Sequence, residues 1–172
     1  ALALNAALTA DGTLDLDGDT TLTLNGVTLT GGGAVTVNDA LTLATGASTV
    51  ASTSGDVSFA STIDGAQAFS VEALAGTVDF GGAVGGSTRL ASLALDAGAL
   101  TLDQNLSTAG GSSATIDLRG VDAVTLGSSV TLDTENGDAT DAGSILFGPA
   151  TTVDGARSEE RRVGKECATG CR

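Results

Sequence analysis

An eleven-residue motif that recurs along the chain sets the length of its structural unit. Residues 55–65 read GDVSFASTIDG, and residues 76–86 repeat the pattern as GTVDFGGAVGG. Residues 143–155 repeat it again as GSILFGPATTVDG, with two additional residues before the second apolar position. The copies start 21 and then 67 residues apart, and 67 is close to three times 22. A period of this length predicts a solenoid, in which each unit buries its apolar face only against its neighbours.

Much of the remaining chain alternates between apolar and polar residues. Residues 13–17 (TLDLD) and 21–25 (TLTLN) place leucines on one face and polar side chains on the other. A second theme recurs at residues 40–43 (ALTL), 99–102 (ALTL) and 123–126 (AVTL), and its last two copies start 24 residues apart. Alternation with a period of two is typical of β-strands. Asx-Gly pairs end several of these stretches and favour turns.

These patterns predict an all-β chain in which residues 1–156 form a parallel β-helix (β-solenoid) of about seven coils, each of roughly 20–24 residues. The chain has no Trp, Tyr or Met and only four Phe, which suits a narrow interior. Residues 66–75 and 90–100 are rich in Ala and Leu, yet they keep the period of two, so we expect strands there rather than helices. Residues 104–113 are expected to form a loop. A β-sandwich of about seven strands is the alternative.

The charge is concentrated in one part of the chain. Residues 1–156 contain 18 acidic residues and only two basic ones, Arg89 and Arg119, which gives a net charge of −16. Such a body repels the phosphates of nucleic acids and of anionic membranes, so we expect neither as a partner. No stretch approaches the ~20 apolar residues of a membrane-spanning helix, so we expect no membrane insertion.

Residues 157–172 depart from this pattern. They contain five basic and three acidic residues and both cysteines of the chain, Cys167 and Cys171. Residues 157–167 (RSEERRVGKEC) resemble the conceptual translation of a sequencing adapter. We therefore expect residues 157–172 to be a non-native or disordered tail, and residues 1–156 to be a fragment of a longer repeat array. Two cysteines in a chain without histidine do not supply the ligands of a metal site.

Candidate sites for chemistry are few. Residues 1–156 contain no His, Cys, Lys or Tyr, so we expect neither catalytic nor cofactor-binding residues. Asp15, Asp17 and Asp19 alternate along the chain and are the best candidates for a Ca²⁺ site. The loop that they open fails the EF-hand pattern, because Thr20 occupies its sixth position and Gly26 its twelfth. We therefore interpret these aspartates as solvated and expect no bound metal.

Two Thr-x-Thr pairs, at residues 21–23 and 28–30, raise the possibility of an ice-binding face. Such a face needs the same pair at the same place on every coil, and the pattern lapses after residue 30. We interpret these threonines as ordinary outward residues, because β-branched side chains suit a pleated surface.

The repeated pattern G-x-[VI]-x-F followed by [VI]-x-G, with its Asp-Gly turns, resembles the β-strand-repeat region of large bacterial exoproteins, the filamentous-haemagglutinin-like and autotransporter adhesins. The resemblance covers roughly residues 20–156. It implies a right-handed parallel β-helix, export across the outer membrane and display at the cell surface, with no catalytic residues.

On this basis we expect a structural stalk or passenger segment of a secreted adhesin, located outside the cell. Its expected partners are the neighbouring coils of the parent chain and surface molecules of a host or a neighbouring cell. The alternatives are a carbohydrate-binding or carbohydrate-cleaving β-helix and a Ca²⁺-dependent surface-layer repeat.

Overall fold

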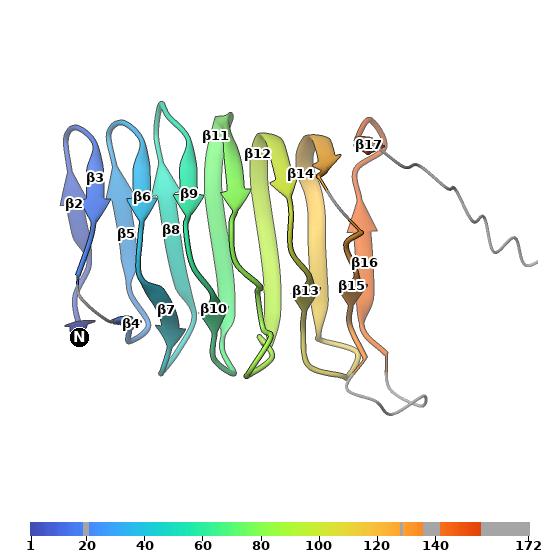
Figure 1. Cartoon of the computed structure of the whole chain (residues 1–172), viewed down its shortest axis with the longest axis horizontal. Helices are drawn as coiled ribbons and strands as arrows, with labels where there is room; N and C mark the ends of the chain where they lie inside the picture. Colours follow the sequence, from blue (N-terminus) through green and yellow to red (C-terminus); the bar gives the residue numbers. More distant parts are fainter. Residues whose placement is uncertain (19–20, 128, 136–141, 156–172) are drawn as a thin grey trace, which may run out of the picture.

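The computed structural model describes residues 1–18, 21–127, 129–135 and 142–155. Their strands pair in parallel and wind into a right-handed β-solenoid, and the described residues contain no helix. The coils stack along one axis to form a rod (Figure 1). Right-handed winding is the usual hand of a crossover between parallel strands of one sheet. The prediction of a parallel β-helix is confirmed, and the β-sandwich is wrong because its sheets would be antiparallel.

Each coil contributes one rung to each of three faces, which we number in chain order. The first face consists of β1 (Leu2–Leu4), β4 (Thr21–Leu24), β7 (Ala40–Leu43), β10 (Ile63–Asp64), the bridge residue Val84, β13 (Leu106–Ser107) and β15 (Leu132–Asp133). The second face consists of β2 (Leu8–Ala10), β5 (Thr28–Gly31), β8 (Ser48–Ser52), the first halves of β11 (Ala68–Phe80), β12 (Ser92–Leu102) and β14 (Thr115–Leu126), and β16 (Ser144–Phe147). The third face consists of β3 (Leu14–Leu16), β6 (Val35–Val37), β9 (Val57–Phe59), the second halves of β11, β12 and β14, and β17 (Thr152–Gly155).

Seven rungs on each face are joined by about six turns of the chain, close to the expected seven coils. On the third face, the inward residues that pair from coil to coil run from Leu14 to Val153 and lie 21, 22, 21, 22, 24 and 29 residues apart. The first five steps agree with the predicted coil length. The last step is longer because it includes the acidic stretch that begins at Glu135, most of which (136–141) lies outside the described residues.

The interior of the rod is a column of apolar side chains, one layer per coil. In β4, Leu22 and Leu24 are buried, whereas Thr21 and Thr23 are half-buried on the outer side. The rings of Phe59 and Phe80 stack with their centroids 5.4 Å apart, so the aromatic position of one coil lies on that of the next. Because this alternation recurs from coil to coil, the buried apolar residues of successive coils form one continuous core.

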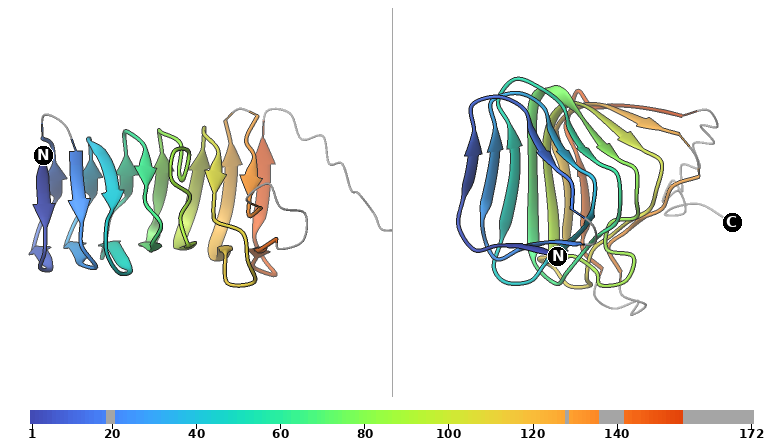
Figure 2. Two further views of the ribbon diagram at one scale, coloured as in Figure 1. Left: turned by 90° about the horizontal axis from the view of Figure 1, so that it is seen from below. Right: turned by 60° about the vertical axis from the view of Figure 1, so that its left-hand side comes forward.

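A column of glycines marks the corner between the second and third faces. Its members are Gly12, Gly33, Gly55, Gly76 and Gly98, spaced 21 or 22 residues apart. A Cβ on Gly55 would lie 2.6 Å from the backbone nitrogen of Ala34, and a Cβ on Gly76 would lie 2.8 Å from the carbonyl carbon of Gly55. At Gly55 and Gly76 the chain thus approaches the preceding coil too closely for a side chain. Figure 2, turned to bring the N-terminal end forward, shows the successive corners overlying one another.

The third copy of the motif occupies a different position from the first two, which corrects our sequence interpretation. Val57 and Val78 pair on the third face. The corresponding Ile145 pairs with Ile116 on the second face, and Val153 occupies the place of Val57 instead. The residue that lies three coils beyond Val78 in the same column is Val153. It follows Val78 by 75 residues, not 67, because the later coils are longer. The near-multiple of 22 was therefore a coincidence.

Two other local predictions had different outcomes. The strands expected within residues 66–75 and 90–100 are confirmed as parts of β11 and β12. The loop expected over residues 104–113 is wrong in part, because β13 lies within it. Leu106 is fully buried and continues the inward row of the first face, and this burial outweighs the loop-forming composition around it.

Candidate functional site

The predicted Ca²⁺ candidates do not form a ligand set in the described part of the rod. Asp15 points outward from β3, and its Oδ1 accepts a hydrogen bond of 2.8 Å from Nδ2 of Asn38 on the next coil. Asp17 is exposed just beyond β3, and Asp19 lies outside the described residues. The described residues contain no group of three or more His, Cys, Asp or Glu that could hold a metal ion.

We predict that the melting temperature is the same in millimolar Ca²⁺ and in chelator. Two isolated carboxylates offer too few oxygens to a cation that takes six to eight. A site filled at one hundred times its dissociation constant would stabilise the fold by about 2.7 kcal/mol, which is several degrees in a chain of this size. A circular dichroism melt measures this directly. A rise of that size in Ca²⁺, absent in Mg²⁺, would support the surface-layer alternative.

The Thr-x-Thr pairs belong to different faces of the rod. Thr21 and Thr23 lie on the first face in β4, whereas Thr28 and Thr30 lie on the second face in β5. On the second face, the outward positions aligned with Thr30 are Thr9 and Ala51. The two pairs therefore do not combine into one array of threonines.

A shallow groove lies where the second face bends into the third. Its volume is about 400 Å³. It spans three consecutive coils because Glu72 pairs with Asp96, and Asp96 with Gly120, across adjacent strands. The lining residues are Ser70, Glu72, Ala94, Leu95, Asp96, Asp117, Arg119 and Gly120. Sequence reasoning missed the groove because its carboxylates come from different coils and share no motif.

The electrostatics of the groove are dominated by one ion pair. Arg119 donates from Nε and Nη2 to the two carboxylate oxygens of Asp117, at 2.9 and 2.6 Å. This bidentate bond lowers the pKa of Asp117 below its ordinary value. A glycosidase needs the opposite, a carboxyl group whose pKa is raised so that it can act as the general acid. No aromatic side chain lines the groove as a platform for a sugar ring.

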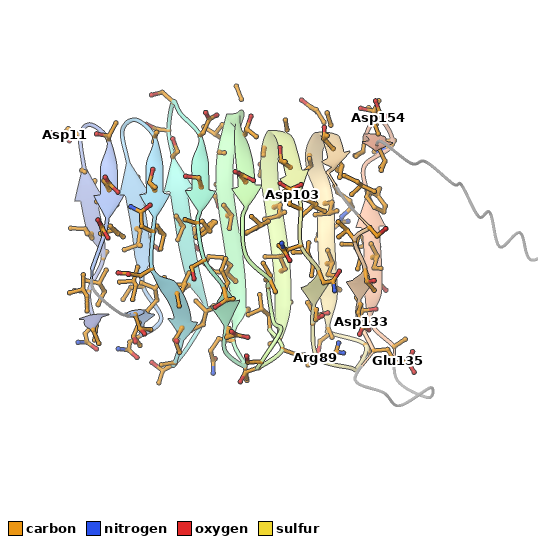
Figure 3. The ribbon with its side chains drawn as sticks, viewed as in Figure 1. Asp11, Arg89, Asp103, Asp133, Glu135 and Asp154 are labelled. Atoms are coloured by element: carbon orange, nitrogen blue, oxygen red, sulfur yellow. The ribbon has the colours of Figure 1, made fainter. Side chains whose placement is uncertain are left out.

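Arg89, the other arginine of residues 1–156, links its own coil to later coils. Nη2 of Arg89 donates to Oδ2 of Asp133 at 2.6 Å, and Nη1 donates to the carbonyl oxygen of Thr108 at 3.1 Å. The pair joins residues 44 positions apart and so spans the intervening coil (Figure 3). The bond to Arg89 lowers the pKa of Asp133. Both arginines of the described part are therefore engaged with carboxylates of the chain itself.

Asp79 is an outward aspartate of the third face whose environment favours the neutral form. Partial burial raises its pKa, and the negative charge of Asp103 raises it further. Because the folded state binds this proton more tightly than the unfolded chain, the ionised carboxylate costs stability as the pH rises above about 4.

We predict that Asp79→Asn stabilises the fold at pH 7 by up to about 0.5 kcal/mol, the usual ceiling for surface substitutions. The gain should disappear near pH 3, where the wild-type carboxyl group is protonated in both states. Urea denaturation at the two pH values measures the difference. Asp122→Asn, at an exposed corner, is the control for a general loss of negative charge. An equal gain for both variants would mean that only net charge matters.

Comparison with known proteins returned no relative. No protein-family model matches the chain, and neither a curated protein nor a solved structure matches it significantly. None of the described residues forms a helix that is long and apolar enough to cross a membrane.

Proposed function

We propose that residues 1–156 serve as a structural stalk or passenger segment of a secreted bacterial surface adhesin, without catalysis. The observation that carries the proposal is the continuous stacking of seven rungs on each of three faces around one apolar core. In such a rod, length grows by one strand spacing of about 4.8 Å for each coil, so the coil count sets how far the segment reaches.

The chemistry of the surface supports a spacer more than a binding or catalytic module. Thr, Ser and Asp cover the outside, and Arg89 and Arg119 are already paired with carboxylates. The groove at Glu72, Asp96 and Asp117 is shallow, and the bond from Arg119 lowers the pKa of Asp117, which is the opposite of what a general acid for hydrolysis needs. Net negative charge keeps such rods dispersed outside the cell. In this role its partners are the adjoining coils of the parent chain and surface molecules of a host or neighbouring cell.

The test displays the chain on a bacterial surface, between an outer-membrane anchor and a fluorescent reporter. Energy transfer to a membrane dye then measures how far the reporter stands from the lipid. We expect a narrow distribution of distances between the reporter and the membrane. Its mean should be about 30 Å greater than without the chain, because the rod spans six strand spacings. A Gly/Ser linker of equal length is the control and should give a broad distribution centred near 60–75 Å. A broad distribution for the chain, or a reporter retained inside the cell, would contradict the proposal.

A second candidate function is carbohydrate binding, which the groove at Glu72, Asp96 and Asp117 favours. Carboxylates that line a groove across successive coils can accept hydrogen bonds from sugar hydroxyl groups. Titration calorimetry with neutral oligosaccharides tests this reading, with Asp96→Ala as the variant. Binding that the variant abolishes would favour this function over the stalk.

A further inference from the structure

The groove at the bend from the second face into the third lies within the rod's length, where β11, β12 and β14 run side by side (Figure 1). Further coils lie on both sides of it, because β8 pairs with β11 and β16 with β14. Small residues make the hollow: Ser70 pairs with Ala94 in one column, and Gly120 follows Asp96 in the next. A Cβ on Gly120 would lie 3.1 Å from Cγ of Asp96, so the glycine leaves this carboxylate open to solvent.

Two carboxylates of the groove have no partner within the part of the chain that the structure describes. Glu72 and Asp96 are both exposed and lie directly opposite each other on β11 and β12. Neither accepts a hydrogen bond from another described residue or forms an ion pair with one. Arg119 does not neutralise them, because its Nε and Nη2 both donate to Asp117. Two like charges one strand spacing apart, about 4.8 Å, repel each other, and a cation that contacts both relieves this repulsion.

An exposed leucine lies beside this pair of carboxylates. Leu74 is 52% exposed and follows Glu72 by two residues on the outward side of β11. Its φ of +47° lies in the left-handed region, which bulky residues rarely occupy. Its partner on β12, Ala97, has too short a side chain to cover it. An apolar side chain therefore faces solvent next to two negative charges, in a strained conformation of the kind that is frequent at ligand sites.

The chemistry of these three side chains selects the kind of ligand. Two carboxylates offer too few oxygens to Ca²⁺, whereas a guanidinium group carries five N–H donors in a planar fork and can contact both. In an extended segment, residues two positions apart lie on the same side, which is also the spacing between Glu72 and Leu74. An arginine that is followed two residues later by an apolar residue would therefore place its charge at the carboxylates and its apolar side chain against Leu74.

We propose that this groove docks an extended basic segment of a partner protein, with an arginine between Glu72 and Asp96 and an apolar residue on Leu74. The inference rests on the proposed function in one respect, because this partner is one of the surface molecules assigned to the adhesin. The 18 acidic and two basic residues of the range 1–156 give it a net charge of −16, which attracts a basic segment from solution.

Fluorescence anisotropy of labelled peptides, titrated with the full chain in reducing buffer, tests the docking. One peptide has an arginine and, two residues later, a leucine among glycines and serines; a second has citrulline, the neutral isostere, in place of the arginine. We expect the arginine peptide to bind about tenfold more tightly than the citrulline peptide, because its contacts to the carboxylates are charge-assisted. Glu72→Gln and Asp96→Asn should each weaken binding of the arginine peptide by about tenfold.

Leu74→Ser separates the apolar contact from the charge. It should weaken binding of the arginine peptide by about threefold, in proportion to the apolar area that the contact buries. It should not change the affinity for an arginine peptide that has serine in place of the leucine. All four substituted positions are exposed, and circular dichroism melts confirm that each variant is folded. An equal loss for both peptides would contradict the proposed contact with Leu74.

Asp11→Asn is the matched control, because it removes one negative charge at an exposed turn of the first coil (Figure 3). It should leave the affinity within about twofold of wild type, because salt screens a charge so far from the groove. If it weakens binding as much as Asp96→Asn, net charge alone attracts the peptide and the proposed site is wrong. Equal affinities for the arginine and citrulline peptides, or no binding at millimolar concentration, would also overturn the proposal. Displacement of the arginine peptide by a neutral oligosaccharide would assign the groove to carbohydrate instead. A negative result here leaves the stalk intact, because the reporter distance in the display experiment does not depend on the groove.

Discussion

Replacing Gly76 with Ala is expected to destabilise the fold by about 3 kcal/mol, at the upper end of the cost of overpacking. The new Cβ would overlap the carbonyl oxygen of Gly55 and lie 2.8 Å from its carbonyl carbon. Both atoms belong to the backbone of the preceding coil, which cannot move aside without breaking its own hydrogen bonds to the coils around it. Chemical denaturation followed by circular dichroism measures the change.

Gly12→Ala is the matched control for this substitution. Gly12 occupies the same corner of the first coil, and an added Cβ there would meet no atom within 4 Å. We expect its free energy of unfolding to change by less than about 0.5 kcal/mol, as for other surface substitutions. Equal losses for the two variants would mean that the glycines serve the backbone conformation of the corner and not the close approach of the coils.

Phe80→Ala is expected to cost about 3–5 kcal/mol, the usual range for a buried aromatic residue. Phe80 is fully buried, and its ring stacks on that of Phe59, which also meets Phe69 edge to face. Loss of the ring leaves a cavity in the narrow interior of the rod, where few neighbouring side chains can move to fill it.

Phe147→Ala tests the corrected alignment of the motif copies. Phe147 has the same place in its motif as Phe80, so the sequence pattern alone predicts an equal loss. In the structure it lies on the second face of the last coil and is 43% exposed. We therefore expect a loss of about 1 kcal/mol or less, in proportion to the smaller apolar area that it buries. A loss as large as that of Phe80→Ala would contradict the register assigned to β16.

Much of the fold could be predicted because each coil repeats the same local rule. Leu22 and Leu24 lie on one side of their strand and Thr21 and Thr23 on the other, as the alternation required. The coil length followed from copies that lie on adjacent coils, such as Val57 and Val78. Local pattern was enough here because nearest-neighbour stacking is the main tertiary interaction of a solenoid.

The third copy was assigned to the wrong place because the motif required phenylalanine at its fifth position. If the third and fifth positions of the motif are allowed to be any apolar residue, Gly12, Gly33, Gly55, Gly76 and Gly98 each begin a copy on the same corner. The copy at Gly143 matches the letters but not the place. Glycine is required by the backbone approach at the corner, whereas Leu102 or Phe80 can fill the interior equally well.

Contacts that join coils far apart in sequence could not be predicted. The ion pair between Arg89 and Asp133 joins residues 44 positions apart. The groove at Glu72 and Asp96 depends on how the bends of successive strands align. Register shifts in β11 and β12 set that alignment, and no local pattern encodes them. For the same reason, Asp15, Asp17 and Asp19 were chosen from their spacing in the sequence, whereas the carboxylates of the groove come from several coils.

The most direct test of the central claim, that this chain is a rod of interchangeable coils, is the thermal unfolding of two deletion variants. Deletion of residues 56–76 removes one whole coil and joins Gly55 to Thr77, so that Val78 takes the place of Val57. Deletion of residues 56–66 removes about half a coil and places second-face residues on the third face. We expect the first variant to keep its β-sheet circular dichroism and a cooperative transition, and the second to lose both. If the half-coil deletion melts as cooperatively as the whole-coil deletion, or if the whole-coil deletion does not fold, the claim is wrong.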